Sequence, residues 1–462
     1  MITLFGIPNC DKIKQARAWL CNHGLQYHFH NYKSDGCDGN LTATLLQHFT
    51  YPELINKRGT TWRKLPENLK ASLDVKVAKE LMTSQPSIIV RPIFKIDEEW
   101  SLGFNEGLIS KSRELRKEEM IQEVHSYAFG IGTKNSAGEI IEVFYPRPQI
   151  HPDKITVQRL IEISGLENTG YIELTEAQTD LVNRSFSEGV FIDQSEISEG
   201  ISAANTTILM LQFEDTAPTS IPGAFLKLHL LSHRLAEPNK INLDGLFSVL
   251  KNIAWTDQGP VDLIDLPLRQ LEARSQGKVL SVESVDKFPK MTDYVVPSGI
   301  RIADTSRVRL GAYIGSGTTV MHEGFVNFNA GTQGTAMVEG RISAGVIVAK
   351  GSDLGGSSST MGTLSGGGTE LVSVGENCLI GANAGIGFPL ADGCTIEAGL
   401  YVTAGMKVNM LNAEGDLVKI TKAKDIRTEK NLIFRRNSLS GAIECIPDTG
   451  NMSLNEELHS HN

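Results

Sequence analysis

Aliphatic residues recur at every sixth position in the last third of the chain. The series begins with Ile302, Val308, Ile314, Val320 and Val326. It resumes in three further runs, which are Ile342, Val348 and Leu354; Val374, Ile380 and Ile386; and Leu390, Ile396, Val402 and Val408. An amphipathic helix needs a period of about 3.6 residues and a half-buried strand a period of about two, so neither explains the series. The pattern instead predicts stacked equivalent units, each of which buries its aliphatic side chain against its neighbours.

Short residues follow several of the aliphatic positions and indicate tight corners. Gly315 and Gly381 are examples. We therefore expect the aliphatic side chains to point into a three-sided prism whose corners turn sharply. This prediction places Val308, Ile314 and Val320 one above another inside the prism.

The chain before the repeats has other patterns. The predicted elements are a strand at residues 2–6, helices at 11–22, 154–164 and 243–253, and a hairpin formed by residues 128–131 and 140–145. The patterns predict a multidomain chain, with a small α/β unit at residues 1–116, a mixed α/β middle domain at 117–294, the prism at 295–430 and a C-terminal segment at 431–462.

The length and composition of the chain exclude several classes of protein. A length of 462 residues is enough for two or three domains. The net charge of −10 argues against a nucleic-acid partner, because neutralising phosphates needs a basic face. No stretch approaches about 18 consecutive apolar residues, and the first residues lack a secretory signal, so we expect a cytoplasmic protein with no membrane contact. The six cysteines have no metal-ligand spacing and are expected to be free thiols.

Two kinds of residue outside the repeats could carry chemistry. Cys10 precedes the predicted helix at residues 11–22, whose N–H groups and dipole favour a thiolate. The alternative is a small buried cysteine with a packing role. His229 and His233 are expected to be ordinary, partly buried histidines.

The six-residue repeat resembles that of the left-handed parallel β-helix acyltransferases, whose prisms form homotrimers with acyl-CoA in the groove between neighbours. A purely structural β-solenoid is the alternative. Five stretches within and after the repeats are more specific and resemble the tetrahydrodipicolinate N-succinyltransferases of the actinobacterial and pseudomonad type. They are residues 295–303, 321–331, 338–343, 362–368 and 434–438. The resemblance covers residues 120–447 and implies transfer of succinyl from succinyl-CoA to the amino group of ring-opened tetrahydrodipicolinate, in the diaminopimelate branch of lysine synthesis.

The resemblance also implies roles for single residues. Glu339 is the expected catalytic residue, either as the carrier of a transient acyl-anhydride or as a general base for direct attack by the amine. Arg341 is two residues further on, which on a strand means the same face, and its guanidinium could grip a carboxylate of succinyl or of the substrate. A solvated arginine on the outside of the prism is the alternative.

The residues expected to bind coenzyme A fall into two groups. The pantetheine arm and the acyl end are assigned to Gly356, Ser359, Ala382, Glu397, Ala398 and Gly405. The phosphate end is assigned to Lys419, Arg435, Arg436, Asn437 and Ser438. Residues 355–368 are expected to leave the prism as a loop that could close over the substrates.

Magnesium is a further expectation from the resemblance. Glu323 resembles a family glutamate that binds the ion near the threefold axis of a trimer, where three copies gather negative charge. The family can supply a second carboxylate at the position aligned with Ser306, and serine there puts a fully ligated site in doubt.

Residues 1–116 resemble the thioredoxin-like proteins related to arsenate reductase. The matching stretches are residues 9–11, 58–64 and 86–92. Ile13 and Lys14 replace the Ser-Arg pair that follows the family's cysteine. An anion pocket of Cys10, Arg58 and Arg91 with a glutathione-linked thiol activity is one hypothesis, and a packing or regulatory role is another.

Two alternatives to the succinyltransferase remain open at this point. One is another hexapeptide acyltransferase that uses acetyl-CoA. The other is a redox or binding protein in which the prism is only a scaffold.

Overall fold

The structure is a computed structural model and describes residues 2–22, 27–96, 99–104, 123–186, 205–365 and 368–448. The chain divides into two compact units, Met1–Ile121 and Gln122–Asn462. Within the described ranges, no helix is long and apolar enough to cross a membrane.

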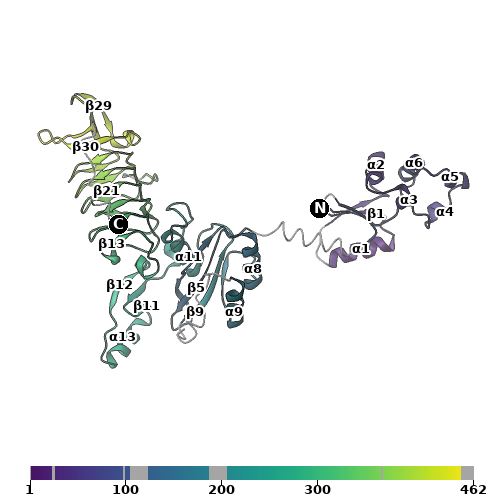
Figure 1. The fold of residues 1–462 in the computed structure, drawn as a ribbon, viewed down its shortest axis with the longest axis horizontal. Coiled ribbons are helices and arrows are strands. Elements are labelled where there is room, and N and C mark those ends of the chain that lie inside the picture. The colour runs from purple at the N-terminus through teal and green to yellow at the C-terminus, as the bar shows by residue number, and fades with distance from the viewer. Residues whose placement is uncertain are drawn as a thin grey trace. The chain divides into compact units, whose positions relative to one another are not determined.

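The first unit is a thioredoxin-like α/β fold built on a four-stranded sheet (Figure 1). The strand order is β2-β1-β3-β4, with β1 parallel to β2 and antiparallel to β3. Buried apolar side chains of β1 and α1, such as Leu4, Ile13 and Leu20, pack together and hold the helix on the sheet. The predicted strand and helix at the start of the chain are confirmed. The elements are β1 (Ile2–Gly6), α1 (Asp11–Asn22), β2 (Tyr27–Asn31), α2 (Gly39–His48), α3 (Tyr51–Leu54), α4 (Thr60–Arg63), α5 (Glu67–Ala71), α6 (Val75–Ser84), η1 (Pro86–Ile88), β3 (Ile93–Ile96) and β4 (Glu99–Leu102).

The second unit begins with a mixed α/β part. Its main sheet has the order β6-β5-β9-β8, with β7 also paired to β5, and a smaller sheet has the order β11-β10-β12. The predicted hairpin and the helix at residues 154–164 are confirmed as β5, β6 and α8. The elements are β5 (Ser126–Lys134), β6 (Ile140–Phe144), β7 (Gln149–Ile150), α8 (Lys154–Ser164), β8 (Gly170–Glu173), α9 (Glu176–Ser185), β9 (Asn205–Gln212), α11 (Ile221–Ser232), α12 (Leu246–Val249), β10 (Ile253–Thr256), β11 (Gly259–Asp262), α13 (Leu266–Ser275), β12 (Val282–Asp286) and η2 (Met291–Asp293).

The predicted helix at residues 243–253 is wrong. Gly245 has a φ of +74° and precedes a helix, α12, of only 4 residues. Leu250 is already extended, and Ile253 begins β10. Leu246, Leu250 and Ile253 are all buried in one core, so their helix-like spacing reflects the burial of a segment that is largely irregular.

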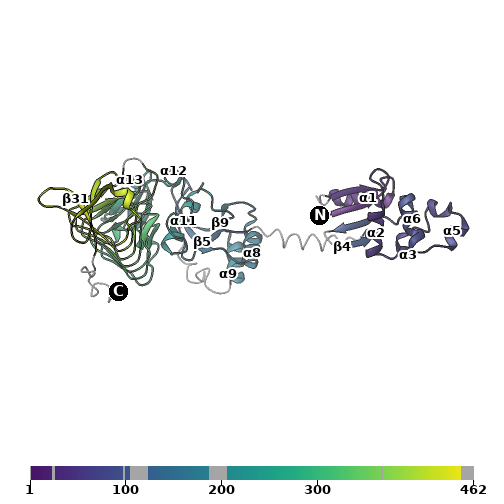
Figure 2. The same cartoon turned by 90° about the horizontal axis from the view of Figure 1, so that it is seen from above.

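The rest of the second unit is the left-handed parallel β-helix that the repeat predicts, a prism whose coils pair in parallel and whose last strands form the antiparallel pairs β28–β29 and β30–β31 (Figures 1 and 2). It has three faces: a ten-stranded sheet (the long sheet), a four-stranded prism sheet and a five-stranded prism sheet. The long sheet contains β13 (Arg301–Ile302), β15 (Thr318–Val320), β18 (Ala336–Val338), β21 (Ser352–Leu354), β24 (Leu379–Ile380), β26 (Thr395–Ile396), β28 (Lys407–Leu411), β29 (Leu417–Lys422), β30 (Leu432–Arg436) and β31 (Ile443–Pro447). The four-stranded prism sheet contains β14 (Ala312–Ile314), β17 (Ala330–Thr332), β20 (Ile347–Val348) and β23 (Ser373–Val374). The five-stranded prism sheet contains β16 (Phe325–Val326), β19 (Arg341–Ile342), β22 (Ser359–Thr360), β25 (Gly385–Gly387) and β27 (Tyr401–Thr403). Two 3-10 helices, η3 (Thr305–Arg307) and η4 (Ala423–Ile426), interrupt the coils.

The aliphatic repeat lines the inside of the prism, as predicted, but its vertical register differs from the prediction. Val308, Ile314 and Val320 lie on three successive faces of one coil, because a coil has three sides of about six residues each. Ile302 instead pairs with Val320, and Val308 pairs with Val326. The residue that stacks on a given position is therefore one whole coil away in sequence.

The aliphatic series lapses at Thr332, which is buried inside the prism. Its hydroxyl lies 2.8 Å from the hydroxyl of Thr318 and accepts a hydrogen bond from the N–H of Gly315 at 3.1 Å. A buried threonine can replace an aliphatic residue here because its polar atom is satisfied by these partners.

The expected loop at residues 355–368 begins later than predicted. Ser359 and Thr360 form β22 and stay in register with β19 and β25. The chain leaves the prism after Met361 and forms a short excursion in which the N–H of Leu364 donates to the carbonyl of Glu370 at 2.9 Å. The serine-rich stretch is thus a corner of the prism, whereas Gly366 and Gly367 of the expected loop lie outside the described residues.

Candidate active site

Five of the predicted site residues lie in one corner of the prism, the corner that joins the long sheet to the five-stranded prism sheet. We call it the site corner; its turns are residues 339–340, 355–358, 381–384 and 397–400. Backbone hydrogen bonds hold successive turns in register. The N–H of Glu339 donates to Leu354 O at 2.8 Å, and the N–H of Asn383 donates to Gly356 O at 2.8 Å. The sequence-predicted residues Gly356, Ala382, Glu397 and Ala398 therefore follow Glu339 along a single edge.

Glu339 lies in the turn that follows β18, beside the next coil of the prism. The Glu339 side chain is half-buried, and a Cβ added at Gly356 would lie 3.6 Å from its Oε2. Gly340 follows, and a Cβ there would come within 2.0 Å of Ser358 Oγ and 2.6 Å of Ser358 O. Only glycine fits at residue 340, and this packing holds the Glu339 carboxylate over the corner of the following coil.

Arg341 projects outward from β19, next to this corner. Its Nη2 donates to the hydroxyl of Ser359 at 2.7 Å, and the two residues are register partners on neighbouring strands. The Arg341 side chain is exposed. The arrangement leaves a cation, a hydroxyl and the Glu339 carboxylate within a few residues of one another, which is a set suited to binding a carboxylated acyl group beside a base.

The basic cluster after the repeats has fewer free groups than its sequence indicates. Arg435 Nε lies 3.0 Å from Glu444 Oε2, and Asn437 Nδ2 donates to the other oxygen of Glu444 at 2.7 Å. The N–H of Arg436 donates to Glu397 Oε2 at 2.7 Å, which ties the cluster to the site corner. The Arg436 and Ser438 side chains are exposed, whereas Asn437 is half-buried and organises its own loop.

Gly405 and Lys419 do not lie on the site corner. Gly405 belongs to the turn between β27 and β28, which is a different corner of the prism, and the N–H of the preceding Ala404 donates to Ser365 Oγ at 2.8 Å. Lys419 lies on β29, a strand that pairs only with β28 and projects an exposed face. The chain by itself therefore does not bring these two residues to Glu339.

Glu323 lies one coil below Glu339 on the same edge, and its side chain is exposed. Arg307 Nη2 donates to the backbone carbonyl of Glu323 at 2.9 Å, and the hydroxyl of Ser306 donates to Asp304 at 2.6 Å. Within the described residues of one chain, no group of three His, Cys, Asp or Glu side chains could hold a metal ion. A magnesium site would need the carboxylate of Glu323 from more than one chain.

Cys10 in the first unit is partly exposed and lies at the start of α1, as predicted. Partial burial alone would raise the pKa of its thiol, but the N–H groups of Ile13 and Lys12 and the guanidinium of Arg91 together lower this pKa. Arg91 also donates to the carbonyl of Ser87 at 2.8 Å. The structure brings Arg91 but not Arg58 to Cys10, since no described contact joins Arg58 to the thiol.

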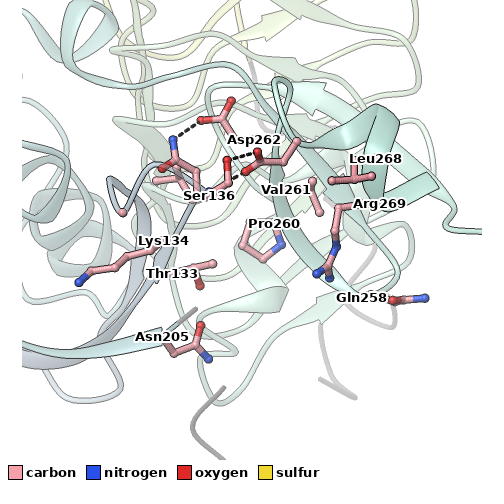
Figure 3. A pocket seen from close by; sticks show the side chains of 14 residues that line it. Thr133, Lys134, Ser136, Asn205, Gln258, Pro260, Val261, Asp262, Leu268 and Arg269 are labelled. Carbon is pink, nitrogen blue, oxygen red and sulfur yellow. Dashed lines mark hydrogen bonds between the residues drawn. The ribbon is translucent and has the colours of Figure 1, made fainter. Parts of the chain in front are cut away.

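The largest of the described cavities lies elsewhere in the second unit (Figure 3). It has a volume of about 730 Å³ and is bounded by the β5–β6 turn, β11 and α13. Asn135 donates to Asp262 at 2.9 Å, and the N–H of Ser136 donates to Asp265 at 2.9 Å, so its polar walls bond to each other (Figure 3). None of the residues predicted to act in acyl transfer lines it.

Tyr401 is a candidate site residue that the sequence analysis did not name. It is the first residue of β27 and lies on the outer face, and its register partner on β25 is Gly385. A Cβ at Gly385 would lie 2.3 Å from Cε2 of the tyrosine, so the ring covers this glycine. The six-residue repeat could have identified Tyr401, because it occupies the same outward position of the repeat as Arg341.

Family comparisons agree with this architecture. The hexapeptide repeat of succinyl-transferase matches residues 371–404, and the middle and N-terminal models of tetrahydrodipicolinate N-succinyltransferase match residues 250–290 and 188–248. The ArsC family matches residues 5–112.

Similar proteins cover almost the whole second unit. The 2,3,4,5-tetrahydropyridine-2,6-dicarboxylate N-succinyltransferase of Pseudomonas putida is 54% identical over 345 residues, which are 74% of this chain and 100% of that relative. The protein of the same name from Vibrio cholerae is 53% identical over 345 residues, 73% of this chain and 99% of its own. A Campylobacter jejuni crystal structure, described as a candidate 2,3,4,5-tetrahydropyridine-2-carboxylate N-succinyltransferase, superposes with a TM-score of 0.65 at 30% identity and covers 73% of this chain and 97% of its own.

The fold, the corner site and these matches define the class of the chain: it is a hexapeptide-repeat acyltransferase with an ArsC-family domain at its N-terminus. More narrowly, the chain belongs to the 2,3,4,5-tetrahydropyridine-2,6-dicarboxylate N-succinyltransferase family. The family expected from the sequence is confirmed.

Proposed function

We propose that the site corner transfers a succinyl group from succinyl-CoA to the amino group of ring-opened tetrahydrodipicolinate. The observation that carries the proposal is the convergence of Glu339, Arg341 and Ser359 at one edge of the prism, with Arg341 fixed by its 2.7 Å hydrogen bond to Ser359. A purely structural solenoid would have no reason to hold a half-buried carboxylate beside an exposed guanidinium there.

The chemistry assigned to Glu339 is that of a general base. The amine attacks the thioester carbonyl, the Glu339 carboxylate accepts the proton that the amine loses, and the C–S bond breaks. The thiolate of coenzyme A leaves and takes up that proton, so atoms and charges balance. No described hydrogen bond or ion pair occupies the carboxylate of Glu339, and an unengaged carboxylate is free to accept the proton.

A covalent acyl-anhydride on Glu339 is the competing mechanism, and it predicts a different result in the absence of the acceptor. Mixing the enzyme with succinyl-CoA alone would then release a burst of coenzyme A, about one per site, whereas a general base releases none until the amine is added. Rapid-quench measurement of free coenzyme A separates the two mechanisms.

The donor is the second point to test. Turnover of tetrahydrodipicolinate is measured with succinyl-CoA and with acetyl-CoA at equal concentrations. The proposal expects succinyl-CoA to be the better donor by a wide margin, because Arg341 can pair with the terminal carboxylate that acetyl lacks. A clear preference for acetyl-CoA would make the chain a different acyltransferase, and loss of activity in Cys10→Ser but not in Glu339→Ala would favour the scaffold hypothesis.

The active assembly that we propose is a cytoplasmic homotrimer. Gly405 and Lys419, which lie off the site corner, could then reach the coenzyme from a neighbouring chain and complete the binding set with the phosphate-end residues. Exposed aliphatic side chains support a contact surface on this unit: Ile264 is 82% exposed, Leu268 60% and Leu271 66%. Light scattering at assay concentrations tests the mass, and a monomeric active enzyme would contradict the assembly.

A magnesium ion on the threefold axis is the last part of this proposal. One chain offers a single suitable carboxylate, Glu323, whose side chain is exposed and has no described ion pair. Three chains would supply three oxygens and gather enough negative charge to hold the ion. Metal analysis of the trimer should find one magnesium per three chains, and Glu323→Gln should lose it.

A thiol activity is a second candidate function, for the first unit only. The lowered pKa of the Cys10 thiol, caused by the start of α1 and by Arg91 against the opposing effect of burial, favours a reactive thiolate. Peptide-resolved alkylation at neutral pH should modify Cys10 well before the buried Cys394, whose pKa burial raises to about 12. Equal rates at the two cysteines would argue for a packing role instead.

A further inference from the structure

The first residue of each strand in the five-stranded prism sheet lies on the outer face of that sheet. In order along the prism these are Phe325, Arg341, Ser359, Gly385 and Tyr401, each the register partner of the next. Neighbouring strands lie about 4.8 Å apart, so the five positions form a straight row. From Arg341 to Tyr401 each position directly follows a turn of the site corner, so this part of the row runs alongside that corner.

Tyr401 extends back along this row toward Ser359. A Cβ on Gly385 would lie 2.3 Å from Cε2 and 2.7 Å from Cζ of the tyrosine ring. The ring therefore crosses the coil of Gly385, whose register partner on the next strand is Ser359. The missing side chain at Gly385 creates the space for this ring, and no described hydrogen bond engages the Tyr401 hydroxyl.

The hydroxyls of Ser359 and Tyr401 can both act as donors. Ser359 accepts its 2.7 Å hydrogen bond from Arg341 Nη2, which leaves its own O–H free to donate. The exposed guanidinium of Arg341 keeps further N–H groups. A row of one cation and two hydroxyls is a receptor for a carboxylate, which accepts hydrogen bonds at both oxygens.

We infer that Tyr401 is a specificity-determining residue that binds the terminal carboxylate of the succinyl group together with Arg341 and Ser359. Arg341 lies two residues after Glu339, across the corner turn, so their backbones are at most about 7 Å apart, which is comparable to the length of a four-carbon acyl chain. A thioester carbonyl at Glu339 would therefore place the far carboxylate on this row. The inference rests on the proposed function, and it makes Tyr401 one of the groups that select succinyl-CoA as the donor.

The test compares two donors that differ only at the far end of the acyl chain. Succinyl-CoA ends in a carboxylate, and butyryl-CoA has the same four carbons and ends in a methyl group. Their dissociation constants are measured by titration calorimetry without acceptor, for the wild type and for Tyr401→Phe. The phenylalanine keeps the ring over Gly385, so the coil retains its packing.

The expected result is that Tyr401→Phe weakens the binding of succinyl-CoA by about tenfold and leaves butyryl-CoA within about twofold, because only the carboxylate loses a hydrogen bond to a charged group. Tyr313→Phe is the matched control; Tyr313 is the half-buried middle residue of β14 on another face of the prism, and this change should leave both constants unaltered. An equal loss for both donors, no loss for either, or a rise only in the KM of the acceptor would each overturn the inference.

Failure of the proposed function would look different. In that case the wild type would release no coenzyme A from succinyl-CoA when tetrahydrodipicolinate is added, whatever the binding constants are. A wild type that turns over, combined with a Tyr401→Phe variant that keeps its preference for succinyl-CoA, would remove the role of Tyr401 and leave the succinyltransferase intact.

Discussion

Gly340 illustrates how a single residue sets the geometry of the site. The atoms of Ser358 occupy the place where a side chain would begin, so Gly340→Ala must push two coils of the prism apart. We expect a loss of about 2 kcal/mol in the free energy of unfolding and a large fall in the rate of coenzyme A release, because Glu339 moves with the corner. Gly356→Ala is the control for stability, since its Cβ would meet nothing closer than 3.6 Å, and thermal unfolding should show it close to wild type. Equal stability of the two variants would contradict the packing argument.

His229 should make the protein sensitive to acid. Complete burial lowers the pKa of His229 to about 3. The nearby charge of His233 lowers this pKa further, whereas the hydrogen bond to the carbonyl of Phe225 acts in the opposite direction. The Nε2 of His229 also accepts the N–H of Tyr145 at 3.1 Å, which a protonated ring could not do. Between about pH 6.5 and pH 3 the unfolded chain binds a proton at this residue that the folded chain does not, so stability falls as the pH falls through that window.

The measurement for His229 is urea unfolding at pH 7, 6 and 5. The wild type should lose about 1 kcal/mol more per pH unit below pH 6 than His229→Gln, which keeps an acceptor for Tyr145 but does not titrate. Identical slopes for the two proteins would show that His229 is not the group responsible.

Helix α11 is the element that joins the middle sheet to the prism, and it contains a buried charge. Lys227 is fully buried and forms an ion pair with Asp215, whose other oxygen accepts the N–H of Asn242 at 2.8 Å. Asp215→Ala should cost about 3 to 5 kcal/mol, because it leaves a buried ammonium without its partner. The double variant Lys227→Met with Asp215→Ala should recover much of that loss in denaturant unfolding. If it is as unstable as the single variant, the loss comes from Asn242 and the loop rather than from the charge.

The elements also show what the sequence could and could not predict. The six-residue spacing predicted the prism, because a regular coil buries an aliphatic side chain at regular intervals along the sequence. The vertical register was assigned wrongly because residues six apart lie on neighbouring faces of a three-sided coil, so Ile302 stacks on Val320 and not on Val308. Helix α11 was not predicted, since 11 of its residues are buried and it has no polar face to produce a helical period.

The site residues follow the same division. Glu339 and Arg341 were predicted through a resemblance, and the structure places them on one corner with Ser359. The sequence could not indicate that Arg435 and Asn437 bond to Glu444, because that carboxylate lies on the next strand of the sheet. The spacing of residues along one strand does not reveal which residues of a neighbouring strand they face.

At the scale of the whole molecule, the chain consists of two units with separate cores. The Pseudomonas putida relative matches over 100% of its length and over 74% of this chain, so the remainder of this chain has no counterpart in that relative. We expect a fragment that begins at Gln122 to keep coenzyme A release from succinyl-CoA within about twofold of the full chain. A fragment that is folded by circular dichroism but inactive would instead make the first unit part of the catalytic assembly.

The central claim is that the corner carrying Glu339 performs the acyl transfer, and the kinetics of Glu339→Gln test it most directly. The substitution keeps the shape of the side chain and removes its capacity to take a proton or an acyl group. With tetrahydrodipicolinate as acceptor, we predict that kcat falls by at least about a thousandfold while the KM for succinyl-CoA changes little. A variant that retains most of the wild-type kcat would contradict the account and place the chemistry elsewhere in the molecule.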